Sequence, residues 1–251
     1  MSRRRNVLAG AAVLAVTNLA AALPAAGQAA ERDFLFRVPR VSLGIRGGYA
    51  VARASSEIFD FTRQELTVER SDFDAPAFGG QLAIRVAPRV DVAVDVSVAT
   101  TRTKSEFRDW VDNNDLPIEQ ETEYRRVPLT VGVKAYLKDR GRSVSRFAWI
   151  PARWAPYVGA AGGWVWYRFE QVGDFVDYET LDIFADHFNS EGTTPTVHVY
   201  TGADWSLGPY FVVTAEARYA WARADMSGDF VDFDPMDLSG LQASLGISLR
   251  F

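Results

Sequence analysis

The chain has 251 residues, of which 48% are hydrophobic and 24% are charged, and its net charge is −5 at pH 7. This length suits one large β domain or two smaller domains, and the acidic balance argues against a role in binding nucleic acid. The sequence contains no cysteine, which excludes disulfide bonds, thiol catalysis and thiolate metal sites.

The first 30 residues have the organisation of a secretory signal peptide. Three arginines at positions 3–5 precede an uncharged stretch, mostly Ala, Leu and Val, that ends in the small residues AAGQAA. A basic head, an apolar centre and a small-residue cleavage region mark a chain for export. We expect cleavage between residues 27 and 30, so that residues 1–29 are the signal peptide and residues 30–251 form one β-barrel domain. A retained anchor helix is the alternative, but this apolar part is short and rich in Ala.

Eight segments of the remaining chain alternate apolar and polar residues with the period of two that is typical of β-strands. In chain order they cover residues 41–52, 78–86, 90–99, 126–137, 155–169, 197–207, 211–221 and 241–251. In the third segment, for example, Val92 and Val94 share one face, whereas Asp91 and Asp95 lie on the other. The sequence therefore predicts eight strands, each with one apolar and one polar face.

The polar faces of these strands differ from the outside of a soluble barrel. They consist of small residues with scattered charges of both signs, and the opposite faces of Val, Leu, Ile and Trp suit hydrocarbon. In the Gly-rich fifth segment we expect Val158, Ala160, Trp164 and Trp166 to face outward. Most segments have the length of about 9–11 residues that a strand needs to cross a bilayer. We therefore expect an all-β fold, an eight-stranded antiparallel transmembrane β-barrel, closed because lipid offers no partner to a sheet edge.

The connections between the strands alternate in length. Four long connections cover residues 54–77, 100–123, 169–194 and 223–238. They hold 25 of the 32 acidic residues of the chain. Short periplasmic turns at one end and long extracellular loops at the other are typical of outer-membrane barrels. The many aromatic residues in these acidic loops favour packing on the barrel rim, and they could also extend the sheet beyond the membrane.

One connection, residues 138–155, departs from this rule because it is long where a short turn is expected, and it is basic. We place it in the periplasm, with Trp149 and Trp154 at the inner lipid surface. Contact with an acidic partner is the alternative to such interfacial anchoring.

The last strand carries a further signal. The chain ends in LQASLGISLRF, in which Leu245, Ile247, Leu249 and Phe251 share one face. This ending resembles the terminal assembly signal of bacterial outer-membrane barrels, which closes on an aromatic residue. With the stretches VSLGIRGGY and APYVGAAGG, the mature chain resembles the small eight-stranded barrels of the OmpA-transmembrane, OmpX and OmpW type. The resemblance implies the outer membrane of a Gram-negative-type bacterium, with membrane lipid, lipopolysaccharide and the barrel-assembly machinery as partners.

Ten charged or titratable residues are predicted to face the lumen. They are Arg46, Arg85, Asp91, Asp95, Lys134, His198, Asp204, Glu216, Arg218 and Arg250. An eight-stranded barrel is just wide enough for side chains to fill it, so we favour ion pairs and hydrogen bonds that plug the lumen. The alternative is a narrow, gated channel for small or apolar solutes, as in the OmpW-like group.

The acidic loops repeat a phrase, GDFVDY from Gly173 and GDFVDF from Gly228. Its carboxylates offer candidate ligands for Ca²⁺, namely Asp174, Asp177, Asp229, Asp232 and Asp234. Neither copy has the regular spacing of a dedicated calcium loop, so we favour acidic loops that are simply solvated. The alternative is that divalent cations bind to these loops as a further partner of the protein. We therefore predict no metal site, and we expect no cofactor.

Two histidines are the remaining candidates for catalysis. His198 lies on the predicted lumen face and His187 in the third long loop, and neither has a serine and a carboxylate at a revealing spacing. We therefore expect a protein without enzymatic activity that serves envelope integrity or surface interaction through its acidic loops. An enzyme that modifies outer-membrane lipid ranks third, after the channel.

Overall fold

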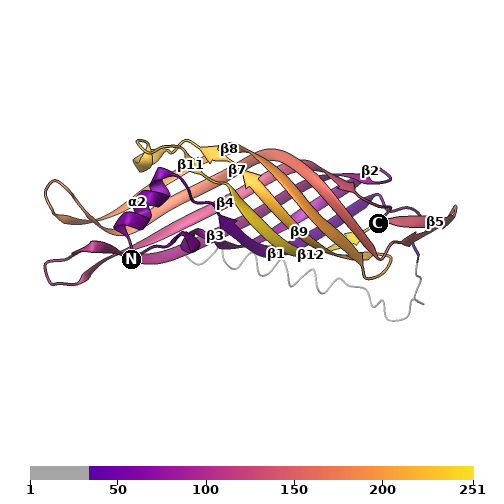
Figure 1. Ribbon diagram of the computed structural model, residues 1–251, viewed down its shortest axis with the longest axis horizontal. Helices are drawn as coiled ribbons and strands as arrows, with labels where there is room; N and C mark the ends of the chain where they lie inside the picture. Colours follow the sequence, from indigo (N-terminus) through magenta and orange to yellow (C-terminus); the bar gives the residue numbers. More distant parts are fainter. Residues whose placement is uncertain (1–33) are drawn as a thin grey trace, which may run out of the picture. The chain divides into compact units, whose positions relative to one another are not determined.

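The computed structural model describes residues 34–251, so the predicted signal peptide lies outside the described residues. Eight strands form one closed antiparallel barrel in the order β1-β12-β9-β8-β7-β4-β3-β2 (Figure 1). These strands are β1 (Val41–Ala52), β2 (Ala75–Ala87), β3 (Val90–Val111), β4 (Pro117–Tyr136), β7 (Trp154–Val176), β8 (Ile183–Ser206), β9 (Phe211–Trp221) and β12 (Gly240–Arg250). All eight predicted strands are present, and the predicted fold class is confirmed.

The barrel closes between its first and last strands. β1 and β12 pair from Ser42 opposite Arg250 to Ala52 opposite Gly240, so the ladder runs the whole length of both strands. The terminal residue takes part, because the Phe251 carbonyl oxygen accepts the backbone N–H of Val41 at 3.0 Å. No strand edge of this sheet is left open along the closure.

The outer surface of the barrel is apolar. Val94, Leu129 and Leu245 are exposed on it, and Trp164 is 62% exposed. Val158 is also exposed, so the predicted orientation of the Gly-rich strand β7 is confirmed. An outward apolar band on a closed antiparallel barrel is the arrangement that spans a bilayer. Within residues 34–251, no helix is long and apolar enough to cross a membrane.

The two ends of the barrel differ. At the end that we call the hairpin end, β3 and β4 are joined by residues 112–116, and β7 and β8 by residues 177–182. At the opposite end, the short-turn end, β2 and β3 are joined by only two residues. The predicted loops 100–123 and 169–194 are therefore wrong as loops, because most of their residues continue the barrel strands as two long hairpins. The expectation that these segments could extend the sheet is confirmed.

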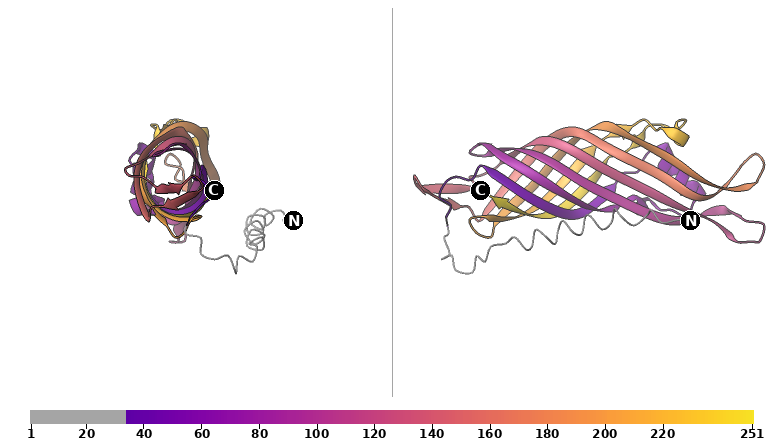
Figure 2. Two further views of the ribbon diagram at one scale, coloured as in Figure 1. Left: turned by 90° about the vertical axis from the view of Figure 1, so that its right-hand side faces the viewer. Right: turned by 180° about the vertical axis from the view of Figure 1, so that it is seen from behind.

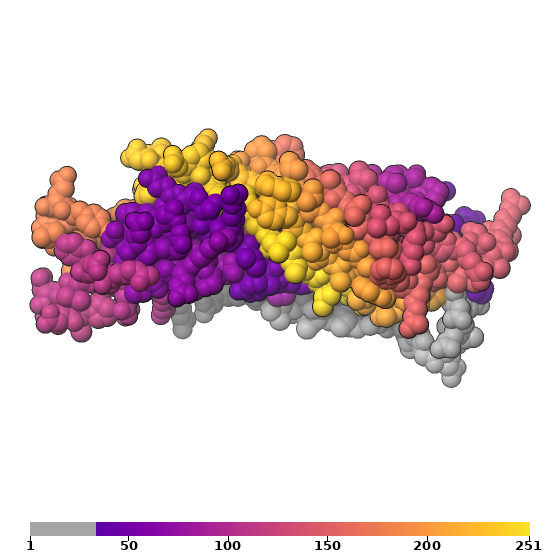
Figure 3. Space-filling view, viewed as in Figure 1, coloured from indigo at the N-terminus to yellow at the C-terminus, as the bar shows by residue number. Residues whose placement is uncertain are grey.

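The remaining two acidic connections also fold at the hairpin end. Residues 54–77 contain the helix α2 (Glu57–Glu65) and the 3₁₀ turn η1 (Arg70–Phe73). Residues 223–238 contain the short strands β10 (Arg223–Ala224) and β11 (Met236–Asp237), with η2 (Gly228–Phe230) between them. In the space-filling view the indigo surface of α2 lies beside the yellow surface of the η2 segment (Figure 3), and Phe61 packs on Phe233 at 5.6 Å between ring centroids.

Helix α2 forms because it has acidic residues in its first turn and a side that can be buried in the core. Its first turn carries Glu57 and Asp60, which suit the positive end of the helix dipole. Ile58, Phe59 and Thr62 lie on one side of the helix and are fully buried. The Thr62 hydroxyl donates to the Ile58 carbonyl at 2.7 Å, so its burial leaves no polar group unpaired.

The buried side of α2 packs into an aromatic core at the hairpin end. The Phe59 ring lies 4.7 Å from Phe73, 5.4 Å from Tyr124 and 6.1 Å from Phe169, all in edge-to-face arrangements. Tyr124 and Phe169 belong to barrel strands, so the aromatic residues of the acidic segments fill the barrel interior as well as its rim. The expected packing of these residues on the rim is thus incomplete, because several of them form a buried core inside the barrel.

The basic connection at the short-turn end forms a hairpin of its own, β5 (Gly141–Ser145) and β6 (Ala148–Pro151). Trp149 is only 3% exposed, and its backbone exchanges two hydrogen bonds of 2.9 Å with Leu35. In the end-on view the hairpin lies within the outline of the barrel (Figure 2). The prediction for Trp149 at the lipid surface is therefore wrong, because its side chain is buried and its ring centre lies 5.2 Å from the Arg250 guanidinium, whereas Trp154 is exposed.

Candidate functional site in the barrel lumen

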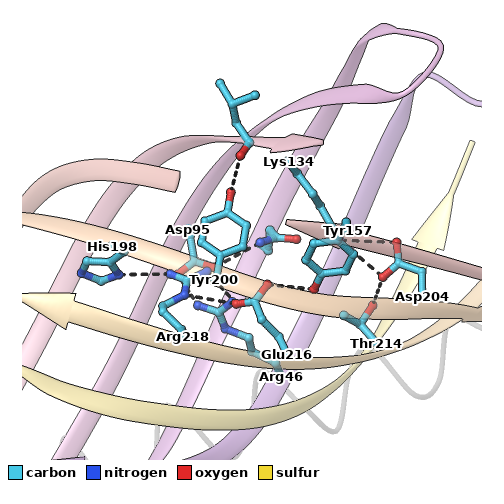
Figure 4. A network of polar contacts seen from close by, with 12 residues as sticks. Arg46, Asp95, Lys134, Tyr157, His198, Tyr200, Asp204, Thr214, Glu216 and Arg218 are labelled. Carbon is cyan, nitrogen blue, oxygen red and sulfur yellow. Dashed lines mark hydrogen bonds and ion pairs between the residues drawn. The ribbon is translucent and has the colours of Figure 1, made fainter. Parts of the chain in front are cut away.

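Four charged side chains form an alternating ring across the middle of the lumen (Figure 4). Arg46 of β1 pairs with Asp95 of β3 and with Glu216 of β9, the latter at 3.0 Å. Arg218 of β9 pairs with the same two carboxylates, at 3.0 Å and 2.9 Å. Each side chain of this charge ring is at most 9% exposed. Two positive and two negative charges balance, which is the condition under which buried ion pairs persist.

Two tyrosines pack beside the charge ring in pockets made by glycines. Tyr157 lies opposite Gly202, and Tyr200 lies opposite Gly159, on the paired strands β7 and β8. A Cβ atom on Gly159 would lie 2.2 Å from the Tyr200 ring, so this position needs a residue without a side chain. The Tyr157 hydroxyl donates to Glu216 at 2.9 Å, and the Arg218 guanidinium lies 4.9 Å from the centre of the Tyr200 ring. Gly159 and Gly202 therefore leave room for the two tyrosine rings in the lumen.

His198 lies on the hairpin side of the charge ring. Its Nε2 is 3.0 Å from the Thr196 hydroxyl, which donates its own proton to the Trp221 carbonyl at 3.1 Å. Because that hydroxyl must accept, His198 donates from Nε2 and presents the Nδ1 lone pair to Arg218, 3.5 Å away. The hydrogen-bond pattern therefore assigns a neutral imidazole, held as part of the lumen packing.

A second cluster lies on the short-turn side of the charge ring and centres on Asp204. This carboxylate accepts from Lys134 at 3.3 Å, from Tyr136 at 2.7 Å and from Thr214 at 2.8 Å. The Lys134 ammonium also lies 3.7 Å from the centre of the Tyr157 ring, which joins this cluster to the charge ring. Both side chains of the ion pair are largely buried.

A third layer closes the short-turn end. Arg140, from the connection before β5, donates to Asp91 at 2.7 Å and stacks over Tyr136. Arg250 donates to the carbonyl oxygens of residues 208 and 209, at 2.7 Å and 2.6 Å. Arg85 donates to backbone carbonyls of its own turn. Sequence reasoning missed Arg140, and the only signal was the basic character of its connection.

All ten residues predicted for the lumen thus line the barrel interior, but not as one network. Two residues, Arg85 and Arg250, lie at the short-turn mouth and bind backbone carbonyls, and neither has a carboxylate partner among residues 34–251. The other eight belong to the charge ring with His198, to the Asp204 cluster or to the Asp91 pair.

The charge ring divides the free space of the lumen. A cavity of about 70 Å³ on the short-turn side is lined by Arg46 and Glu216. A cavity of about 50 Å³ on the hairpin side is lined by Arg218 and His198. Among the described residues, the two cavities share no lining side chain, and side chains of the charge ring line both of them. Beyond the second cavity lies the aromatic core.

A third cavity, of about 240 Å³, lies at the hairpin end. Its walls are mainly aromatic and include Phe61, Phe175, Phe188 and Phe230. Its volume exceeds the roughly 150 Å³ of an engineered apolar cavity that binds benzene. The hairpin end therefore has room for a small apolar molecule.

The carboxylates predicted as calcium candidates are not brought together. Asp177 accepts backbone N–H groups of its own turn, which hold the pKa of its carboxyl below the usual value. Asp229 accepts the backbone N–H of Asn189 at 2.9 Å. Asp174, Asp232 and Asp234 join them in no cluster, since residues 34–251 contain no group of three acidic or histidine side chains placed to hold a metal ion.

His187 lies on the exposed surface of the hairpin end. Its Nε2 is 2.8 Å from Glu170 on the paired strand β7. This pair contains a base and an acid, but no serine hydroxyl among the described residues bonds to the imidazole. The geometry supplies no activated nucleophile at this position.

No protein-family model matches the sequence, and the curated proteins contain no match. Solved structures of small barrels are similar at low identity. Neisserial surface protein A is 12% identical, with 84% of this chain and 96% of that chain covered and a TM-score of 0.43. Ail, the attachment invasion locus protein of Yersinia pestis, is 14% identical, with 85% and 100% covered and a TM-score of 0.41. The N-terminal barrel domain of Pseudomonas aeruginosa OprF is 10% identical, with 86% and 100% covered and a TM-score of 0.38.

Proposed function

We propose that this protein is an outer-membrane barrel without a conducting lumen and without enzymatic activity, which serves envelope integrity or surface interaction through its hairpin end. The hairpin end faces the exterior and the short-turn end faces the periplasm. The observation that carries this proposal is the charge ring, because four paired and buried side chains obstruct the lumen at its middle.

The hairpin end supports a role at the surface. It contains a helix, two long hairpins and an aromatic core of its own, so it can present a defined surface. Its outward side chains include many carboxylates, for example Glu119 and Glu170. We propose that divalent cations join such carboxylates to the phosphates of lipopolysaccharide, since like charges need a bridging cation.

Membrane assembly is the second part of the proposal. Leu245, Ile247, Leu249 and Phe251 are all exposed on the outside of the barrel. A partner could therefore read them from outside, and we propose that the barrel-assembly machinery does so before they enter lipid.

Conductance of the refolded barrel in a planar bilayer tests the proposal. Well-folded protein should pass no discrete current steps, and Arg218→Met, which breaks the charge ring, should pass them if it folds. Steps from the unchanged protein would overturn the plugged lumen. The mobility shift of the unboiled protein on a gel, measured first, shows that the barrel is folded.

A second candidate function is the binding of small apolar solutes, and the aromatic cavity at the hairpin end favours it. An apolar fluorescent probe should bind the folded protein in a ratio of one to one. Phe188→Trp should block binding by filling the cavity, whereas Val231→Trp, on the exposed surface, should leave it unchanged. Equal binding by both variants would reject this candidate.

A further inference from the structure

Arg126 of β4 is a buried cation without an acidic partner. The residue is 8% exposed, and its Nη1 donates to the Leu238 carbonyl at a long 3.4 Å. Its Nη2 has no hydrogen-bond partner. The guanidinium lies 5.0 Å from the centre of the Tyr124 ring, and within residues 34–251 no carboxylate oxygen lies within 4.0 Å of it.

The other cations deep in the lumen are compensated. Arg46 and Arg218 balance two carboxylates in the charge ring, and Lys134 pairs with Asp204. His198, beside Arg126 in the lining of the same cavity, is held as a neutral imidazole. One positive charge therefore remains at this level of the barrel, in a place where an isolated ion is costly.

A cavity of about 50 Å³ lies against Arg126. Ser97 and Gln242 also line it, and their side chains make no hydrogen bond with any described residue. A hydroxyl and an amide each have a donor to offer, as does the free Nη2 of Arg126. The rest of the wall is largely apolar and includes Val165 and Leu238. Three unused donors around one small cavity form a site for an acceptor.

We propose that this cavity binds a small monovalent anion, of halide size, held by Arg126, Ser97 and Gln242. Water would satisfy the donors, but it would leave the charge of Arg126 uncompensated. One unpaired cation calls for one negative charge, which favours a monovalent anion over phosphate or sulfate. The volume fits this choice, because about 10–15 Å³ of such space holds one water-sized particle. The anion would occupy the space between the charge ring and the aromatic core.

Refolding in two salts of equal ionic strength tests the proposal. Sodium bromide supplies a halide, and sodium gluconate supplies an anion too large for the cavity. The thermal midpoint of the unchanged protein should rise with bromide concentration, as ligand linkage requires. Crystals grown in bromide should show anomalous scattering beside Nη2 of Arg126. Equal midpoints in both salts, with only water in the cavity, would overturn the proposal.

Variants locate the response. Arg126→Met should lose the bromide dependence, and in gluconate it should be at least as stable as the unchanged protein. Arg125→Gln is the matched control, because Arg125 is partly exposed and pairs with Glu123 at 2.9 Å, and it should keep the full response. A bromide response that persists in Arg126→Met would reject the site.

If Arg126→Met does not fold, two milder variants test whether the cavity binds the anion. Ser97→Ala and Gln242→Leu each remove one donor to the anion, so each should weaken the apparent affinity for bromide by about tenfold. Unchanged affinity in both would show that the cavity does not hold the anion.

Discussion

The middle of the barrel and its hairpin end are built on the same strands but have opposite interiors. In the middle, the inside holds the charge ring and the outside carries Val, Leu and Ile. At the hairpin end, the inside holds the aromatic core around Phe59 and the outside carries charged residues. Strand β4 shows the change without any break in its alternation. Lys134 faces inward and Leu129 outward in the middle, whereas Tyr124 faces inward and Glu121 is partly exposed beyond it.

This difference teaches that the surrounding solvent decides the interior of a barrel. In lipid, apolar side chains gain nothing by turning inward, and the polar groups gather inside. In water, burial of apolar surface again stabilises the fold, so the same strand positions take aromatic residues. The hairpin end thus has the apolar interior and charged exterior of a protein in water, on strands that continue from the membrane-spanning part.

Breaking the charge ring should have the largest effect. Arg218→Met leaves Asp95 and Glu216 with Arg46 alone, and it should lower the free energy of unfolding by about 3–5 kcal/mol, the cost of an unpaired buried charge. Denaturant unfolding in lipid vesicles, followed by tryptophan fluorescence, measures the loss. The control Arg168→Met removes an exposed pair with Glu191 and should cost about 1 kcal/mol or less. Similar losses in both would mean that the ring is not a balanced unit.

Removing an aromatic side chain at the hairpin end should act locally. Phe59→Ala should destabilise the aromatic core by about 3–4 kcal/mol through the lost burial and the cavity left behind. Amide exchange should accelerate in α2 and the two hairpins, while the gel mobility of the unboiled protein stays unchanged. Phe61→Ala, at a partly exposed position, should do much less. Loss of the whole barrel would show instead that the two regions fold as one cooperative unit.

The terminal aromatic residue should matter for assembly more than for stability. Phe251→Ala keeps the backbone bonds to Val41 and removes only an exposed ring. The fraction of protein assembled in cell membranes should fall several-fold, while refolding into vesicles remains normal. Leu207→Ala, another exposed position, serves as the comparison. Normal assembly of Phe251→Ala would remove the terminal residue from the proposed signal.

The smallest effect is expected at the tip of the β3–β4 hairpin. Asp112 accepts the backbone N–H groups of Leu116 and Asn114, each at 2.8 Å, and these bonds lower the pKa of its carboxyl. A lowered pKa in the folded tip means that the stabilisation is complete above the ordinary value of 3.8 and is lost as the pH falls through the lowered value. Amide chemical shifts of residues 114 and 116 in micelles should move in that acidic range, and Asp112→Ala should abolish the titration. Shifts that persist in this variant would assign the titration to another group.

The sequence predicts the membrane-spanning part of the fold well because a strand there has one lipid-facing side. Val92 and Val94 can face only lipid, so Asp91 and Asp95 must face the lumen, and the structure agrees. The list of lumen residues follows from this rule alone. Which of them pair with each other depends on the stagger between strands, which period two does not contain.

The hairpin end could not be predicted in the same way, because there the apolar side chains face inward and the polar side chains face outward. The outward series of β3 changes from Val98 to Arg102 and Lys104 while the strand continues, and such a change looks like the start of a loop. The alternation itself was the available signal for a longer strand. Arg126 is a different case, because it lies where the interior changes from polar to aromatic. The lack of an acidic partner for it can be seen only in the structure, where all of its neighbours are in place.

The unbroken strands of the two hairpins have a mechanical consequence. β7 and β8 pair residue by residue from Val176 opposite Ile183 down to Trp154 opposite Trp205. A pull on the tip of this hairpin, directed away from the membrane, therefore runs along the strands and loads their hydrogen bonds in shear, with many bonds sharing the force at once. A continuous ladder of hydrogen bonds, and not a flexible linker, connects the tip to the membrane-spanning part of the barrel. A partner that pulls on the tip would load the ladders that join β7 to β4 and β8 to β9.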